Sequence, residues 1–350
     1  VKASDGNTYE YDRVLIATGG NPIVPPISGV EKENISTLKT MADAERVYSM
    51  KGKIAVVIGA GSIGVESAIS LSHRGIKVTL LEQLGTVMPT VFDREAAEIV
   101  QRRVESFGID VICGERAVEF TGNGKVTGVR TNSREIPCDM VVMGIGVQPN
   151  TELAIQAGTS LGLLGGVEVD EKMRTSVPNV FAAGDVCETY DIALERKAIN
   201  AIWPCAMEQG KVAGRNMAGV EAVYPGSVRM NSIGNFIGQP AISLGMIAVP
   251  SEGSGAESGG EYQEVVRKTK DTYRKLILKD GRIKGAILVG DTQKAGIFSV
   301  LLKKQVDVSA FTPILLSHSL SFMDVIPLVR ERADKFYEPE FKELMDTHIV

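Results

Sequence analysis

A glycine-rich turn between an apolar strand and a helix is the feature that most limits what this chain can fold into. The turn reads Gly59-Ala60-Gly61-Ser62-Ile63-Gly64 and directly follows the apolar run at residues 53–58. We expect a helix over residues 63–74 and a second buried strand over residues 77–82. A GxGxxG between a strand and a helix predicts a βαβ unit that holds a dinucleotide, because this context is what separates the motif from a chance match.

Each glycine of the turn has a separate expected role. Gly59 permits the tight turn, Gly61 lets the backbone approach a pyrophosphate, and Gly64 lets the helix pack closely on the strand. The phosphates are then expected at the helix N-terminus, where unpaired N–H groups and the helix dipole attract negative charge.

Glu82 ends the second strand of this unit, and its carboxylate predicts which dinucleotide is bound. A carboxylate at this position accepts hydrogen bonds from ribose hydroxyls and repels a 2′-phosphate. No arginine follows it in the sequence Gln83-Leu84-Gly85. The pattern therefore favours NAD(H) over NADP(H).

Charge and composition exclude several classes of partner. The formal net charge is −5 and the chain has no cluster of Lys and Arg, so we expect neither nucleic acid nor a membrane surface as its partner. No apolar run approaches the roughly 18 residues that cross a bilayer, and the first residues do not form a basic-then-apolar leader. We therefore expect a cytoplasmic protein.

The cysteines do not predict a metal site or a disulfide framework. Cys113, Cys138, Cys187 and Cys205 are widely spaced, without a CxxC pair, and the chain has three histidines. Each is interpreted as a small buried side chain. Cys205 is the one cysteine retained as a candidate for chemistry.

At 350 residues, the chain is long enough for several cores. The sequence predicts an α/β protein in three parts. Residues 46–150 are expected to form a Rossmann-like NAD(H)-binding domain, inserted into a second part made of residues 1–45 and 151–223. From residue 224 the pattern changes to strands and turns, so residues 224–350 are expected to form a separate C-terminal α+β domain.

Five landmarks, in order along the chain, carry a resemblance to a known family. They are Ala17-Thr18-Gly19-Gly20, residues 59–68 (GAGSIGVESA), residues 144–150 (GIGVQPN), residues 175–185 (TSVPNVFAAGD) and residues 206–210 (AMEQG). Through them the chain resembles the FAD-dependent pyridine nucleotide–disulfide oxidoreductase superfamily, which includes rubredoxin reductases, nitrite reductase flavoproteins and NADH oxidases. The resemblance covers almost the whole sequence. It implies that residues 1–45 and 151–223 form an incomplete FAD-binding domain and that residues 224–350 form an interface domain.

The resemblance also implies site residues. Asp185 would bind the ribityl chain of FAD, and the FAD site would further contain Ala17, Thr18, Gly19, Gly184 and Ala206. Ile63 would touch the nicotinamide and Glu66 would lie near it, although an acid in the first turn of a helix also needs no function. Gly146 would let the nicotinamide ribose approach, and Ser62 stands where many members of the family place an aromatic residue.

The sequence departs from the family at its start. The family's first FAD fingerprint, an N-terminal GxGxxG, is absent, and so is the segment that usually carries a redox-active cysteine. We expect that a piece of roughly 90–110 residues that supplies both is either missing from the start of this sequence or comes from another chain. The resemblance further implies a homodimer formed through the C-terminal domain.

These features lead to one leading hypothesis and two alternatives. The leading one is an NADH-dependent flavoprotein that passes a hydride from NADH to FAD and then electrons to a second acceptor, such as a rubredoxin or an iron–sulfur protein. It is favoured by the stretch at residues 203–210 (WPCAMEQG), which resembles the rubredoxin-reductase and nitrite-reductase-flavoprotein branches. The first alternative is an NADH oxidase or a coenzyme A disulfide or persulfide reductase. The second is a non-catalytic NAD-binding fragment, or the large part of a split enzyme.

Overall fold

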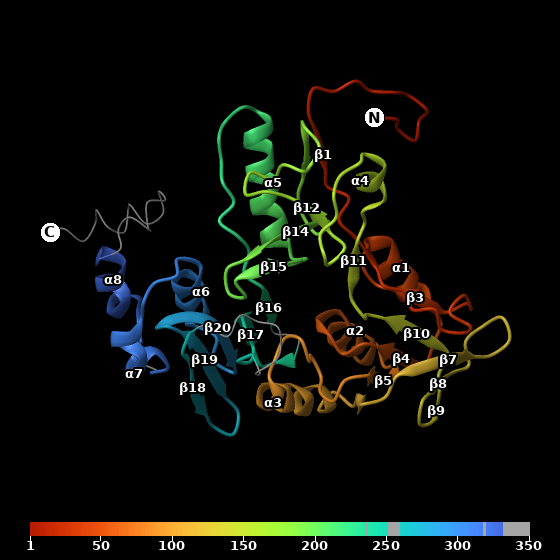
Figure 1. The fold of residues 1–350 in the computed structure, drawn as a ribbon. Helices are drawn as coiled ribbons and strands as arrows, with labels where there is room; N and C mark the ends of the chain where they lie inside the picture. Colours follow the sequence, from red (N-terminus) through yellow and green to blue (C-terminus); the bar gives the residue numbers. More distant parts are fainter. Residues whose placement is uncertain (235–236, 251–259, 318–319, 332–350) are drawn as a thin grey trace. The chain divides into compact units, whose positions relative to one another are not determined.

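The structure is a computed structural model that describes residues 1–234, 237–250, 260–317 and 320–331 (Figure 1). The chain divides into two compact units. Unit 1 contains Val1–Pro25 and Ile145–Arg229, and unit 2 contains Pro26–Gly144 and the described residues from Met230 onward. Each unit is described below by itself.

The centre of unit 2 is a parallel sheet of five strands in the order β3-β10-β4-β5-β6. The strands are β3 (Ile35–Thr37), β10 (Met140–Met143), β4 (Ile54–Ile58), β5 (Lys77–Glu82) and β6 (Asp110–Cys113). All four residues of β10 and four of the five in β4 are buried. Such continuous apolar runs are typical of parallel strands covered on both faces. The predicted Rossmann-like βαβ unit is confirmed.

Three helices belong to this sheet: α1 (Met41–Ser49), α2 (Ser62–His73) and α3 (Arg94–Glu105). Helix α1 begins at a capping box, in which Thr40 and Asp43 each accept a hydrogen bond from the other's backbone N–H. Helix α2 connects β4 to β5, and α3 connects β5 to β6. Because β10 lies on the other side of β4, the strand order reverses between β4 and β10, which is where open α/β sheets bind their ligands.

Two further sheets complete unit 2. A three-stranded antiparallel sheet contains β7 (Ala117–Thr121), β8 (Gly128–Thr131) and β9 (Glu135–Pro137). A five-stranded antiparallel sheet has the order β16-β17-β20-β19-β18, with bounds Met230–Ile233, Ala241–Gly245, Arg282–Val289, Tyr273–Lys279 and Tyr262–Lys268. It is followed by α6 (Ala295–Lys303), η2 (Ser309–Phe311), α7 (Thr312–Leu315) and α8 (Phe322–Glu331).

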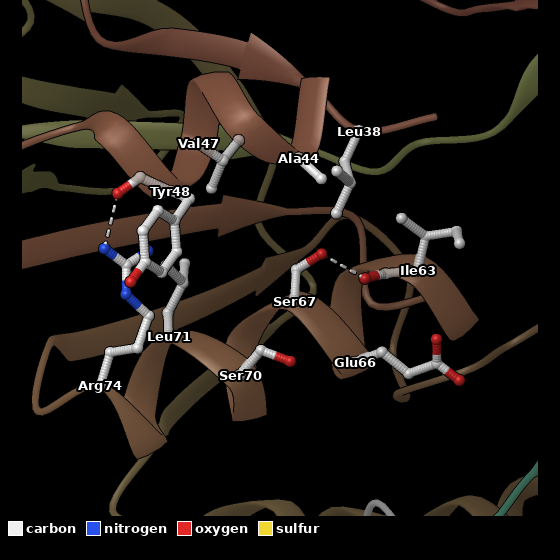
Figure 2. A pocket seen from close by; sticks show the side chains of 10 residues that line it. All are labelled: Leu38, Ala44, Val47, Tyr48, Ile63, Glu66, Ser67, Ser70, Leu71 and Arg74. Atoms are coloured by element: carbon white, nitrogen blue, oxygen red, sulfur yellow. Dashed lines mark hydrogen bonds between the residues drawn. The ribbon is translucent and has the colours of Figure 1, made fainter. Parts of the chain in front are cut away.

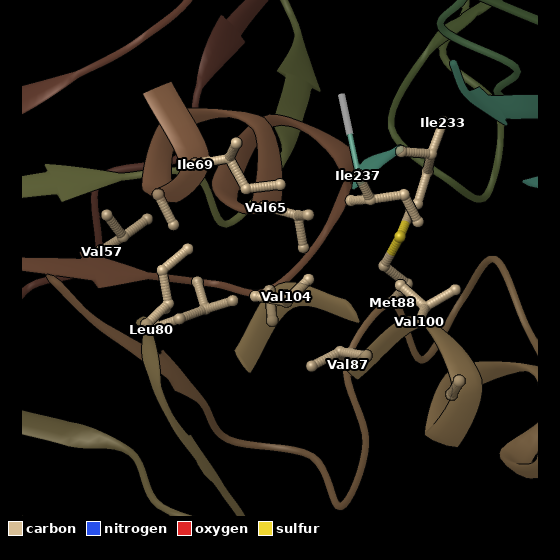
Figure 3. Close-up of a cluster of buried hydrophobic side chains, with 14 of the residues drawn as sticks. Val57, Val65, Ile69, Leu80, Val87, Met88, Val100, Val104, Ile233 and Ile237 are labelled. Carbon is tan, nitrogen blue, oxygen red and sulfur yellow. The ribbon is translucent and has the colours of Figure 1, made fainter. Parts of the chain in front are cut away.

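One hydrophobic core joins the parallel sheet to the C-terminal antiparallel sheet (Figure 3). Met88, which follows β5, is fully buried together with Ile233 and Ile237, and its side chain points toward them. Tyr273 of β19 belongs to the same cluster and donates a hydrogen bond from its hydroxyl to Asp93, the N-cap of α3, at 2.6 Å. The two sheets therefore bury each other's apolar surface.

Unit 1 is built from short strands and one long helix. Strand β1 (Val14–Ile16) pairs in parallel with β13 (Val180–Ala182), and β2 (Gly20–Pro22) pairs antiparallel with β11 (Val147–Pro149). A third sheet contains β12 (Val167–Glu168), β14 (Cys187–Asp191) and β15 (Arg196–Ala198), and the helices are α4 (Glu152–Gln156) and α5 (Trp203–Met217). The opening fragment and the strand near residue 180 thus lie in one sheet.

The boundaries of the two units differ from the predicted three-part division. Strand β3 lies in the range assigned by sequence to the FAD-binding part, yet it pairs with β10 of the Rossmann-like sheet. The two strands run parallel, and Val141 of β10 lies opposite Ile35 of β3. The division at residues 45, 150 and 223 stays a prediction about domains.

Candidate functional site

The turn between β4 and α2 is shaped by its glycines. Gly59 has φ +92° and donates its N–H to Leu81 O at 2.8 Å, so the turn is tied to the neighbouring strand. A Cβ added at Gly64 would lie 1.7 Å from Gly59 O, so only glycine fits there. A Cβ at Gly61 would meet nothing within 4 Å. The turn is closed on the protein side and open at Gly61, as a backbone cradle for a pyrophosphate requires.

Helix α2 begins at Gly61 without a side-chain cap. Its first N–H groups therefore have no side-chain partner at the helix's positive end. This arrangement favours an anionic ligand group at Ser62 and Ile63. The structure thus brings the predicted residues of the turn together in one place.

Glu82 is bound to the same turn by hydrogen bonds. Its carboxylate is 6% exposed, Oε2 accepts from Ala60 N at 2.7 Å, and Oε1 accepts from Leu84 N at 2.9 Å. Each carboxylate oxygen offers two lone pairs, so both oxygens retain capacity to accept a ribose hydroxyl. The acidic residue and the glycine turn form one rigid arrangement at the end of β5.

Gly144 belongs to the landmark at residues 144–150, but the sequence analysis assigned it no role in this site. It follows β10, on the other side of the switch point, and donates its N–H to Ile58 O at 2.8 Å. A Cβ at Gly144 would lie 3.1 Å from Gly64 N. The sequence does show a glycine directly after a buried strand. The position favours glycine, however, because of the close contact with Gly64 across the sheet. Gly146, the predicted residue, has φ +111° and belongs to unit 1.

A pocket of about 320 Å³ lies between α1 and α2 (Figure 2). Ile63 and Glu66 line the end of the pocket near the glycine turn, and Ile63 is 46% exposed. At the other end, the Arg74 guanidinium stacks 4.5 Å from the centre of the Tyr48 ring and donates to Tyr48 O at 2.8 Å. Burial raises the pKa of the Glu66 carboxyl, so its neutral form persists to higher pH than usual.

The residues assigned to FAD by resemblance gather at one edge of unit 1. Ala17, Thr18 and Gly19 follow β1, and Gly184 and Asp185 follow β13. Because β1 and β13 are parallel, their carboxyl ends meet at the same edge. The predicted FAD residues of the two loops are therefore neighbours.

The loops at this edge are held by specific contacts. Thr18 Oγ1 donates to Asn150 O at 2.6 Å, and Gly184 adopts φ +88°. A Cβ at Gly184 would lie 3.7 Å from the Cβ of Ala206, in the first turn of α5. The half-buried Asp185 carboxylate accepts no hydrogen bond from the described part of the chain. It is free to accept from a ligand's hydroxyls.

The four cysteines are unpaired thiols. Burial raises the pKa of Cys113 to about 11 and those of Cys138 and Cys187 to about 12. The thiolate is the nucleophile, so these three are unreactive near neutral pH. Cys205 lies in α5 and is 4% exposed, so its sulfur is shielded from solvent.

Among the residues that the structure describes, no group of three or more His, Cys, Asp and Glu side chains is placed to hold a metal ion. Among the described helices, none is long and apolar enough to span a bilayer.

Two family models match the sequence. The model of the pyridine nucleotide-disulphide oxidoreductases matches residues 1–210, and that of the rubredoxin NAD+ reductase C-terminal domain matches residues 233–306. An NADH oxidase from Methanocaldococcus jannaschii is 34% identical over 83% of this chain and 67% of its own length.

Two solved structures are similar in fold and sequence. A NAD-dependent persulfide reductase from A. fulgidus has 34% identity and a TM-score of 0.78, over 84% of this chain and 57% of that chain. A FAD-dependent pyridine nucleotide-disulphide oxidoreductase from Desulfovibrio vulgaris has 26% identity and a TM-score of 0.75, over 95% of this chain and 85% of that chain. The chain thus spans little more than half the length of the persulfide reductase.

Proposed function

The chain belongs to the pyridine nucleotide-disulphide oxidoreductase family, whose members bind NAD(H) and FAD, and we propose that it is an NADH-dependent flavoprotein oxidoreductase. The observation that carries this proposal is the arrangement of Glu82 and the glycine turn. A buried carboxylate bonded to Ala60 N lies beside an uncapped helix N-terminus. Such a site accepts a pyrophosphate and a ribose with a free 2′-hydroxyl.

The residues present fit both cofactors. The space at Gly61 suits the pyrophosphate of NAD(H), and the Asp185 carboxylate, without a partner of its own, suits the ribityl hydroxyls of FAD. When bound, the two cofactors supply hydride transfer and the onward release of electrons, which protein side chains do not perform themselves. The chain's own contribution is to bind the rings and to keep water away.

Glu66 and Ile63 are proposed to face the nicotinamide end of NADH. Ile63 presents an exposed apolar surface at the mouth of the pocket beside α2. The raised pKa of Glu66 favours a carboxyl that can donate a hydrogen bond as well as accept one. These two side chains would orient the ring, while Gly64 and Glu82 hold the rest of the dinucleotide.

The second acceptor is proposed to be a small electron-carrier protein, such as a rubredoxin or an iron–sulfur protein. The match of residues 233–306 to the rubredoxin NAD+ reductase C-terminal domain supports this choice.

The alternative acceptors are oxygen, as in an NADH oxidase, or a persulfide or coenzyme A disulfide. They are supported by the similarity to an NADH oxidase and to a NAD-dependent persulfide reductase. In these cases the reactive cysteine would be contributed by a segment outside this sequence. A homodimer formed through the C-terminal domain is proposed as well, and light scattering at micromolar concentration measures it directly.

The decisive experiment is a spectrum followed by steady-state kinetics with the protein that carries this chain. We expect a flavin absorption band near ~450 nm, bleached by NADH and far less by NADPH. Reduced protein should then be mixed separately with a rubredoxin, oxygen and coenzyme A disulfide. Fastest reoxidation by rubredoxin would support the proposed acceptor, whereas fastest reoxidation by either other oxidant would select the alternative. A colourless protein that binds NADH and reduces no dye would instead be a non-catalytic NAD-binding module.

A further inference from the structure

Gln209 is a buried polar residue that the binding of cofactors does not yet explain. It lies in α5 and is 3% exposed. Its side-chain Oε1 accepts a hydrogen bond from the backbone N–H of Gly184 at 2.8 Å. Burying an amide side chain is costly unless its hydrogen bonds are made, so this contact is a specific feature of the fold.

The backbone at Gly184 needs such a partner. The last bond of the β1–β13 ladder joins Ala183 N to Ile16 O at 3.1 Å, and after it the chain leaves the sheet. Gly184 turns with φ +88°, and its own O accepts from Cys187 N at 3.0 Å. Its N–H donates to the Gln209 side chain and not to a strand. Without Gln209 this half-buried donor would lose that acceptor, and the turn that carries Asp185 would be held at one end only.

The side chain of Gln209 is itself fixed in orientation. Gln209 and Ala206 are three residues apart in α5, so they lie on the same face of the helix, the face that approaches Gly184. With Oε1 used by Gly184, Nε2 points to Thr189 Oγ1 at 3.4 Å, which is a long contact. The amide is therefore held chiefly by its bond to Gly184 and by close packing.

Tyr224 closes the other side of this cluster. Its side chain is 5% exposed, and its hydroxyl lies close to Gln209 and Cys205 but makes no hydrogen bond of normal geometry in the described structure. Burial raises the pKa of this hydroxyl, so it stays protonated.

We propose that Gln209 is a positioning residue for the flavin site, which fixes the Gly184–Asp185 turn so that the Asp185 carboxylate is presented at the edge of the sheet. The inference deepens the proposed function, because it assumes that Asp185 binds FAD. It assigns to Gln209 no contact with the cofactor. Its effect reaches the cofactor only through the backbone of Gly184.

Three variants test this inference. Gln209→Met keeps the length of the side chain but removes the oxygen, Gln209→Glu restores an acceptor, and Thr189→Val removes only the long contact. Amide hydrogen exchange at Gly184 is measured in the chain without FAD, with circular dichroism to confirm folding. We expect Gly184 to exchange about tenfold faster in Gln209→Met, with partial recovery in Gln209→Glu and no change in Thr189→Val. Unchanged exchange in a folded Gln209→Met would overturn the proposal.

The second measurement is FAD affinity in the protein that carries this chain, including Asp185→Asn as a separate variant. We expect roughly tenfold weaker FAD binding for Gln209→Met and at least as large a loss for Asp185→Asn. A loss with Asp185→Asn and none with Gln209→Met would refute the positioning role alone. If Asp185→Asn has no effect, the flavin assignment of the proposed function fails, while the exchange at Gly184 still decides whether Gln209 holds the turn.

Discussion

The side chain of Glu82 accepts a hydrogen bond from the backbone N–H of Ala60, with 2.7 Å between Oε2 and N. The residue proposed to select the dinucleotide is thus attached to the turn proposed to hold its phosphates. A change in one should disturb the other. Because of this hydrogen bond, a substitution at Glu82 should affect dinucleotide binding more than a substitution of an acidic residue that only faces solvent.

Replacing Glu82 by Gln should raise the KM for NADH about tenfold. A glutamine keeps one oxygen, so Ala60 N or Leu84 N loses its acceptor, and an unsatisfied buried donor costs about 1–3 kcal/mol. Steady-state kinetics with NADH and NADPH measure the effect. Asp110→Asn, at the exposed start of β6, is the matched control and should leave KM unchanged. Equal use of NADH and NADPH by the unmodified protein would contradict the role of Glu82.

Two glycine substitutions separate fold from binding. Gly64→Ala would place a Cβ 1.7 Å from Gly59 O, so the helix must move and we expect a loss of about 1–3 kcal/mol in unfolding free energy. Gly61→Ala meets no protein atom within 4 Å, so stability should hold while NADH binding weakens. Denaturant unfolding and NADH titration of both variants check this. Unimpaired NADH binding by Gly61→Ala would argue against a pyrophosphate at this turn.

Because burial raises the pKa of Glu66, replacing this residue by Gln should increase the unfolding free energy by an amount that depends on pH. Because the folded state holds the proton more tightly than the unfolded state, the unfolding free energy falls as pH rises above the ordinary glutamate pKa of about 4.3. Glu66→Gln removes this titration. The variant should therefore be more stable than the parent near pH 7 and equal to it near pH 3, measured by thermal melts across this range. A constant difference at all pH values would exclude the carboxyl as the cause.

Removing the hydroxyl of Tyr273 should weaken the junction between the parallel sheet and the C-terminal antiparallel sheet of unit 2. Tyr273 is 2% exposed and donates to Asp93 at 2.6 Å, while Lys275 lies 3.3 Å from the same carboxylate. Tyr273→Phe should lower the unfolding free energy by about 1–3 kcal/mol, since a bond to a charged group is lost. Denaturant unfolding measures it. Tyr262→Phe, in neighbouring β18, is the control and should change little.

Thiol accessibility provides a test of the electron path. With raised pKa values of about 11 and 12, Cys113, Cys138 and Cys187 should react slowly with an aromatic disulfide reagent at pH 8. Cys205 should also be slow because it is buried. All four should react at once in guanidinium. A thiol that reacts rapidly in the native protein, and whose modification stops NADH-driven reduction, would move the acceptor assignment toward the disulfide-reducing branch.

The local parts of the site could be predicted from sequence because their signals are local. The glycine turn, Glu82 and the helix between them are separated by few residues, and their spacing alone indicates a βαβ unit. The role of Gly144 in the site was not predicted. Glycine is favoured there because the chain after β10 comes close to Gly64 N, and this contact appears only in the folded structure. Nor does the sequence reveal that Gln209 holds Gly184, because that bond joins a helix face to a distant turn.

The packing of the C-terminal segment against the Rossmann-like sheet could not be predicted from the sequence pattern, while the division into domains stays a prediction. The change to strand and turn patterns after residue 224 suggested a separate core, since composition shifts usually mark domain boundaries. Yet Met88 and Ile237 belong to one buried cluster, and Arg103 donates to Ile237 O at 3.1 Å. A pattern of apolar residues shows which side chains are buried but does not show which other segment buries them.

Because Met88, Ile233 and Tyr273 share one core, the nucleotide-binding part should not fold well when it is expressed without the C-terminal sheet. A gene fragment cut at residue 150 would expose fully buried Met88 to water, and would deprive Asp93 of both Tyr273 and Lys275. The newly exposed apolar surface would make the resulting protein fragment prone to aggregation. A fragment that keeps the nucleotide site folded must therefore contain two stretches of sequence, one with the parallel sheet and one with the antiparallel sheet that covers its core.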